Sequence, residues 1–109
     1  MEFVVPPTGL DVAKFLGREA DATFVALCDQ HVPLVVTFIQ GYTRGQGVDD
    51  AGDMREDLRA VAITATARLV TNPAQVTREE ADGYSAVGSF NGFSLPELAV
   101  LHAYRRRTA

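Results

Sequence analysis

The sequence predicts a mainly α-helical fold, a small bundle of about four helices with a short β-hairpin or extended arm between the third and last helices. Two long segments, residues 21–43 and 53–70, carry apolar side chains at the spacing of a helix face. The Ser94-Leu95-Pro96-Glu97 sequence is a capping box, which marks the start of another helix. Glycines and prolines between these segments indicate turns, so the chain is expected to fold back on itself as a bundle.

Length and composition favour one ordinary globular domain that spans residues 1–109. With 109 residues, of which 47% are hydrophobic, the chain can bury one modest core but has little room for a second. The formal net charge is -4. This acidic balance disfavours a dedicated DNA-binding protein, which needs clustered Lys and Arg.

Three features favour a soluble protein of the cytosol with no membrane contact. Cys28 is the only cysteine, which excludes an intrachain disulfide. The N-terminal residues lack the positive charge and apolar run of a signal peptide. The longest strongly apolar run, residues 32–39, is too short to span a bilayer.

The chain is expected to begin with an extended arm, residues 1–8, because Pro6 and Pro7 interrupt any regular element there. A helix of about two turns follows and ends near Gly17, with Thr8 or Asp11 as its N-cap. Its apolar residues are Leu10, Ala13, Phe15 and Leu16.

The main helix is predicted from Asp21 to about Thr43. Its apolar stripe consists of Phe24, Leu27, Cys28, Val35, Phe38, Ile39 and Tyr42. A second stripe on another face consists of Val25, Val32 and Val36. This surplus of apolar surface predicts burial by a neighbouring subunit. Pro33 removes one backbone hydrogen bond, so we expect a kink or two consecutive helices there.

A glycine-rich loop, residues 45–52, is predicted to precede the third helix, which extends from about Asp53 to Val70. Asp49, Asp50 or Asp53 can cap this helix. Its apolar stripe consists of Met54, Leu58, Val61, Ala62, Ala65 and Leu69. The helix is expected to end before Pro73, because the residue that precedes a proline is pushed out of the helical region.

Residues 75–89 are predicted to form a β-like arm, which Gly83 divides into two parts. A lone hairpin is only marginally stable in water, so its open edge is expected to pair with the same element of another copy. The last segment, residues 94–109, is predicted to be a helix followed by a basic tail. The residues on or near one face of this helix are Leu95, Leu98, Leu101 and His102.

The residues that could carry chemistry do not form a recognisable site. His31 and His102 have no Cys or acidic residue at metal-ligand spacing. Cys28 lies on an apolar stripe and is interpreted as a buried structural residue. The glycines near Gly41 follow a helix, whereas a phosphate-binding loop leads into one, and the acidic residues from Asp49 onward lack the spacing of a calcium loop. We therefore predict no enzyme activity, no metal and no cofactor.

Four short motifs follow one another in the second half of the chain. They are Arg68-Leu69-Val70-Thr71-Asn72-Pro73, Gly83-Tyr84-Ser85, Phe93-Ser94-Leu95-Pro96-Glu97, and Leu101 through Arg105-Arg106. This ordered combination resembles the head-to-tail connector (adaptor) proteins of tailed bacteriophages, especially those that infect actinobacteria. The size of the chain and the predicted order of its elements match as well, so the resemblance covers nearly the whole chain. Pro33 and the lack of a glycine directly after Pro73 depart from the family pattern.

The resemblance implies a structural virion protein that forms a homo-oligomeric ring of about twelve copies. Such a ring docks beneath the portal protein of the head, extends the DNA channel, and offers a platform for a tail-side neck or stopper protein. Genomic DNA passes through it without specific binding. The resemblance therefore places the protein in the head-tail neck of a virion that is assembled in the host cytoplasm.

The resemblance and the residue pattern together give three sets of site candidates. The candidates for portal contact are Leu101, Tyr104, Arg105, Arg106 and Arg107. The candidates for the subunit interface are Val25, Val32, Val36, Arg59, Arg68, Tyr84 and Val87. The candidates that face the channel are Asp49, Asp50 and Asp53, because a negatively charged wall repels phosphates and avoids tight binding.

Two alternatives come from other functional classes. One is a small helical regulator that binds DNA as a dimer, which the arginines of the tail favour and the net charge disfavours. The other is a generic scaffold or interaction domain. Ring formation distinguishes the connector from both.

Overall fold

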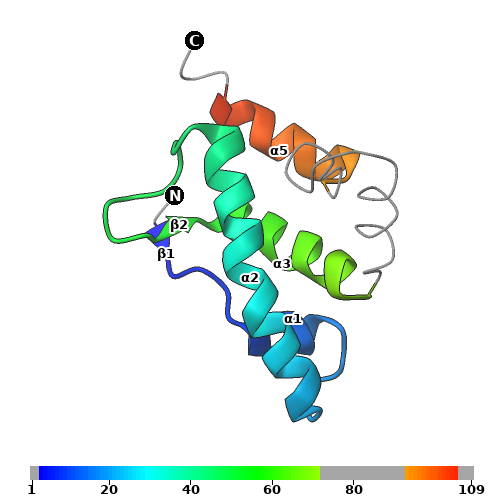
Figure 1. Cartoon of the computed structure of the whole chain (residues 1–109). Helices are drawn as coiled ribbons and strands as arrows, with labels where there is room; N and C mark the ends of the chain where they lie inside the picture. Colours follow the sequence, from blue (N-terminus) through cyan, green and yellow to red (C-terminus); the bar gives the residue numbers. More distant parts are fainter. Residues whose placement is uncertain (1–2, 72–92, 106–109) are drawn as a thin grey trace, which may run out of the picture.

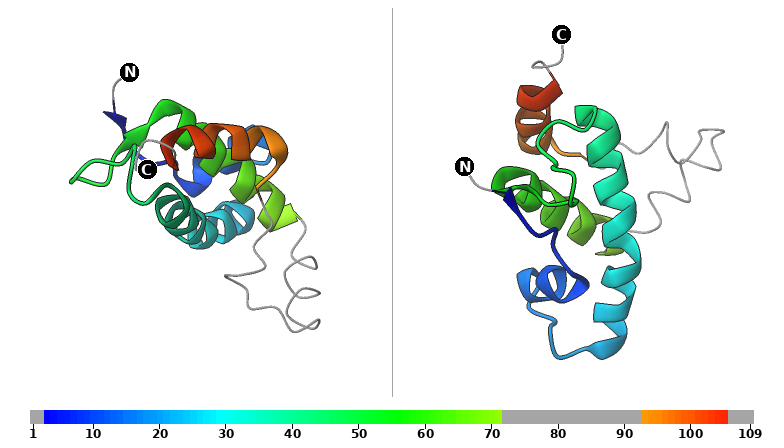
Figure 2. Two further views of the ribbon diagram at one scale, coloured as in Figure 1. Left: turned by 90° about the horizontal axis from the view of Figure 1, so that it is seen from above. Right: turned by 90° about the vertical axis from the view of Figure 1, so that its left-hand side faces the viewer.

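The fold is mainly α-helical, as predicted, in the computed structural model, which describes residues 3–71 and 93–105. The described helices are α1 (Gly9–Phe15), α2 (Ala22–Thr43), α3 (Glu56–Thr71) and α5 (Leu95–Arg105), and the strands are β1 (Phe3–Val4) and β2 (Met54–Arg55). The long helix α2 extends along one side of the molecule, and α1, α3 and α5 pack against its other side (Figures 1 and 2). The predicted β-like arm, residues 75–89, lies outside the described residues.

Local capping sequences begin three of the helices. Thr8 caps α1, because its hydroxyl accepts a hydrogen bond from the backbone N–H of Asp11 while the Asp11 carboxylate accepts one from the N–H of Thr8. Asp21 caps α2 by accepting from the N–H of Phe24 at 3.1 Å. The capping box at Ser94 precedes α5. The capping box at Ser94 was predicted, and Thr8 was one of two predicted caps for α1, whereas Asp21 was predicted as the first residue of α2 and is its N-cap.

Helix α2 passes through Pro33 without interruption, so the alternative of two consecutive helices was wrong. Proline cannot donate to the carbonyl of Asp29 four residues earlier. Both residues are exposed. The helix ends at Arg44, which adopts the left-handed conformation with φ of 58°.

Helix α3 begins at Glu56, later than predicted, because the two residues before it form strand β2. This strand pairs with β1 in an antiparallel register that places Phe3 opposite Arg55. On its other side Met54 forms a bridge with Val48. The N-terminal arm is therefore the outer strand of a small sheet, which no local pattern in the sequence indicates.

The loop between α2 and α3 is a hydrogen-bonded turn. The carboxylate of Asp49 accepts from the backbone N–H groups of Ala51 and Asp53 at 3.0 and 2.9 Å. The N–H of Asp49 in turn donates to the carbonyl of Asp53 at 2.8 Å. Asp49 thus caps this turn and does not cap α3.

The core consists of two clusters that share α2 and α3. The first contains Val35, Ile39, Met54, Leu58, Val61, Ala62, Ala65 and Leu101. The second contains Val12, Ala13, Phe24, Cys28, Val32, Ala67 and Val70. Val36 packs against both, so the two clusters form one continuous interior.

Among the described residues, α2 is the one helix that is long and apolar enough to cross a membrane, by length and composition only. It contacts α1, α3 and α5, as the central helix of a small bundle does. Length and composition therefore do not distinguish a membrane span from a core helix here.

Candidate functional site

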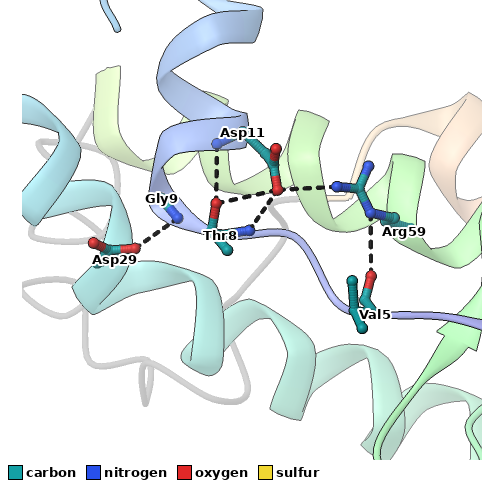
Figure 3. A network of polar contacts seen from close by, with 6 residues as sticks. All are labelled: Val5, Thr8, Gly9, Asp11, Asp29 and Arg59. Carbon is teal, nitrogen blue, oxygen red and sulfur yellow. Dashed lines mark hydrogen bonds and ion pairs between the residues drawn. The ribbon is translucent and has the colours of Figure 1, made fainter. Parts of the chain in front are cut away.

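A polar cluster on the N-terminal half fixes the arm and α1 to the two long helices (Figure 3). From α3, the guanidinium of Arg59 donates to the carboxylate of Asp11 at 2.9 Å and to the carbonyl of Val5 at 3.2 Å. The N–H of Gly9 donates to the carboxylate of Asp29 on α2 at 2.6 Å. Arg59, a candidate for the subunit interface, is thus used within the chain.

The Asp11 carboxylate is stabilised in its charged form by this cluster. The backbone N–H of Thr8 is the largest influence that lowers its pKa below the usual value. Partial burial opposes this, and the Thr8 hydroxyl and the Arg59 charge add to the lowering.

A second polar cluster joins α5 to α3 and centres on Glu97, whose residue surface is only 6% exposed. The Arg68 guanidinium donates to both carboxylate oxygens, at 2.6 and 3.2 Å. The Thr64 hydroxyl and the Ser94 N–H, the latter at 2.7 Å, also donate to this carboxylate. Arg68, another interface candidate, is therefore also paired inside the chain.

Burial alone would raise the pKa of Glu97, because it removes the carboxylate from water. The hydrogen bonds from Arg68, Thr64 and Ser94, together with the Arg68 charge, outweigh burial and lower that pKa. Glu97 is consequently charged at neutral pH and serves as the acceptor that holds α5 on α3.

An open cleft of about 690 Å³ lies at one end of the molecule, beside the last turn of α5. It is lined by Phe3, Gly45, Gln46, Gly47, Val48, Arg55, Asp57, Ala103 and Tyr104. The hydroxyl of Tyr104 donates to the carboxylate of Asp57 at 2.6 Å. The guanidinium of Arg55 lies over the ring of Phe3, 4.4 Å from its centroid. The glycine-rich loop and the last helix, two separately predicted contact regions, therefore meet at this cleft.

Gly47 closes one wall of the cleft in a way that only glycine permits. Its φ is +82°, and a Cβ at this position would lie 2.8 Å from a ring carbon of Tyr104 and 2.6 Å from a methyl of Leu58. Both the backbone conformation and the space therefore require glycine.

The candidates for portal contact occupy different environments. Leu101 is fully buried in the core, so it presents no surface to a partner in this conformation. Tyr104 is partly buried at the cleft, and Arg105 is the last residue of α5. Arg106 and Arg107, and the interface candidates Tyr84 and Val87, lie outside the described residues.

The candidates that face the channel lie together on the loop before β2. Asp50 is exposed, whereas Asp49 and Asp53 are partly buried and support the turn. The loop thus exposes the Asp50 side chain, and residues 45–48 of the same loop line the cleft.

The interface candidates on α2 are mostly used inside the chain. Val32 is 5% exposed and belongs to the core, and Val25 and Val36 are partly buried against it. Leu27, a member of the predicted apolar stripe, is exposed, as is Leu34, which the sequence analysis did not single out. The surplus of apolar surface on this helix exists, but different residues supply it.

We call the exposed side of this helix the outer face of α2. It consists of Ala22, Thr23, Ala26, Leu27, Asp29, Gln30, Pro33, Leu34, Thr37 and Gly41. Asp29 is its charged member, and the carboxylate of Asp29 accepts from the N–H of Gly9. No Lys, Arg, Asp or Glu stands between Gln30 and Thr43, although 22% of the chain is charged. That absence of charge is the signal in the sequence that could have located this face.

The residues that were weighed for chemistry have structural surroundings. The Nδ1 of His31 donates to the carbonyl of Leu27 at 2.8 Å within α2. Cys28 is buried, and burial raises the pKa of its thiol. In the described part of the chain no three His, Cys, Asp or Glu residues lie close enough to hold a metal ion.

No protein-family model, curated protein or solved structure matches this chain.

Proposed function

We propose that this chain is a structural subunit of a bacteriophage neck, where it assembles into a ring between the portal and the tail and catalyses no reaction. The observation that carries the proposal is the outer face of α2, which stays exposed after the chain has packed its own core and carries no charged residue from Gln30 to Gly41. Charged side chains are depleted at the centre of protein interfaces, so such a face fits a contact between proteins.

The cleft end of the molecule supports a second contact, with the portal protein. The last turn of α5 and the glycine-rich loop meet there, and Arg105 ends the helix beside it. In this proposal Tyr104, Arg105 and the following arginines contact the portal. The remaining end is left for the tail-side neck or stopper protein.

The acidic loop supports passage of DNA without binding. Asp50 is exposed, and Asp49 and Asp53 stand on the same turn. A ring that turns this loop inward presents a negative wall, which repels the phosphates of the passing genome. An assembled structure with these residues on its outer rim would remove this part of the proposal.

The decisive experiment is a native mass measurement of the purified chain over a concentration series, combined with electron microscopy of the largest species. A closed ring of about a dozen subunits is expected at high concentration or when a purified portal ring is added. A stable dimer that binds DNA with an affinity that falls steeply as salt rises would contradict the proposal and favour a regulator.

A further inference from the structure

We infer that the outer face of α2 binds a second copy of this chain, and that the surface it meets on that copy is the N-terminal arm with the start of α1. This inference rests on the proposed ring and names the two surfaces that form its repeated contact. It is argued from charge, position and area.

Charge is the first argument. Residues 3–10 of the arm and α1 contain no Lys, Arg, Asp or Glu, as is also true of the α2 segment from Gln30 to Thr43. Both segments expose apolar side chains: Val5 is 65% and Leu10 41% exposed, and Leu34 on α2 is 47% exposed. These apolar side chains can meet without burying an unpaired charge, because the neighbouring Arg59 is already paired with Asp11 and with the carbonyl of Val5.

Position is the second argument. Helix α2 lies on one side of the molecule, while β1, the arm and α1 lie toward the other (Figure 2). A contact between two different surfaces on opposite sides of a subunit is repeated from copy to copy, and such a contact closes into a ring when the rotation permits. Pairing of α2 with α2 would give a closed dimer instead.

Rigidity of the arm supports this placement. Arg59 holds the carbonyl of Val5 at 3.2 Å, and β1 pairs with β2, so the arm is fixed before any partner arrives. A preformed surface loses little conformational freedom when it binds.

Area is the third argument, and it selects a ring over a stable pair. The uncharged segment of α2 from Gln30 to Thr43 has 14 residues and is about 21 Å long, so a face about 10 Å wide offers roughly 210 Å². Counting both partners, the contact buries about 420 Å², below the roughly 1,200–2,000 Å² of a stable specific interface. One contact alone is therefore weak, whereas closure of a ring gives every subunit two.

The test compares two variants of the full chain in the native mass and microscopy experiment. Leu34→Glu places a charge in the middle of the outer face of α2. Leu95→Glu is the matched control, because Leu95 is 82% exposed on α5, away from this face. We expect Leu34→Glu to weaken association at least tenfold and Leu95→Glu to leave it unchanged, with both variants retaining the circular dichroism and melting temperature of the wild type.

A crosslink identifies the partner surface. In a chain that carries Val5→Cys and Leu34→Cys, oxidation at high concentration is expected to give a ladder of multimers, whereas each single variant gives no ladder. The native Cys28 is fully buried and does not take part.

Five results would overturn the inference. If rings form equally well with Leu34→Glu, the ring stands but its contact lies elsewhere. If Leu34→Cys alone gives efficient dimers, α2 pairs with α2. If Leu34→Glu lowers the melting temperature of the monomer, the face is covered within one chain. If the wild type stays monomeric at every concentration and on an added portal ring, and the double cysteine variant gives no crosslink, the partner is not a second copy. If the chain binds lipid vesicles through Leu34, the partner is a membrane surface.

Discussion

The Glu97 cluster gives the sharpest prediction for stability, because one buried carboxylate accepts from three residues on two elements. In Glu97→Ala, the bonds from Arg68, Thr64 and the Ser94 N–H are lost together. Removing one member of a fully buried ion pair costs about 3–5 kcal/mol. The Arg68 side chain is 36% exposed and can be rehydrated, so we expect a smaller loss of about 2–3 kcal/mol in the free energy of unfolding.

This loss should be visible in a thermal melt followed by circular dichroism. For a chain of this size about 1 kcal/mol corresponds to roughly 4 °C, so the melting temperature of Glu97→Ala should fall by about 8–12 °C at pH 7. Glu19→Ala is the control, because Glu19 is exposed. A melting temperature for Glu97→Ala within about 2 °C of the control would refute the idea that this cluster holds α5 in place.

The same cluster has a pH dependence whose sign follows from the lowered pKa of Glu97. A carboxylate with a lower pKa in the folded state stabilises the fold fully above the unfolded value of about 4.5. That stabilisation is lost as the pH falls through the folded pKa. The stability difference between the wild type and Glu97→Gln should therefore stay constant near neutral pH and shrink in acid. A difference that grows in acid would show that the carboxylate is not stabilised in its charged form.

Four further substitutions test packing, each by chemical denaturation. Gly9→Ala should cost about 1–3 kcal/mol of stability, because its Cβ would lie 2.5 Å from the backbone nitrogen of Asp29. Gly41→Ala is the comparison: its Cβ would meet open space, so it should gain up to about 1 kcal/mol. Equal effects of the two substitutions would contradict the close approach of α1 and α2. Pro33→Ala should stabilise α2 by about 1–3 kcal/mol, since it restores a helical hydrogen bond, and a loss of stability would show that the proline fits its site. Thr66→Val should be neutral or stabilising, because the Thr66 hydroxyl is buried with no hydrogen-bond partner among the residues that the structure describes, and a large loss would reveal a partner.

The sequence was sufficient to predict those elements that are determined by neighbouring residues. Ser94 was identified as a helix start, and Thr8 as one of two candidates with Asp11, because each cap involves a residue three positions away. Helix α2 was bounded almost to the residue by its apolar period and by Asp21.

Long-range pairing could not be read from the sequence. Residues 54 and 55 form strand β2 because they pair with Phe3 and Val4 of β1, and α3 therefore begins only at Glu56. Arg59 and Arg68 were assigned to an interface because helical spacing does not reveal their partners. Each forms an ion pair with a carboxylate of the same chain, 48 positions away for Arg59 and 29 for Arg68. A surplus of arginine on a helix therefore says little until its partners in other elements are known.

The division of α2 into core and surface was predicted only in part, for a related reason. Apolar period marks which residues share a face, but α1 and α3 together decide which faces are covered. Val32 belongs to the core cluster that contains Val12 and Ala13 of α1, whereas Leu27 is exposed. The absence of charge between Gln30 and Thr43 was the better guide to the exposed face than the count of apolar residues.

The cleft depends on two elements that lie far apart in the sequence. Its walls include Phe3 on β1 and Tyr104 on α5, which are 101 positions apart. Local unfolding of either element would remove one wall, so the cleft exists only while the small sheet and α5 are both folded. A molecule that binds there would therefore distinguish the fully folded chain from a partly unfolded one.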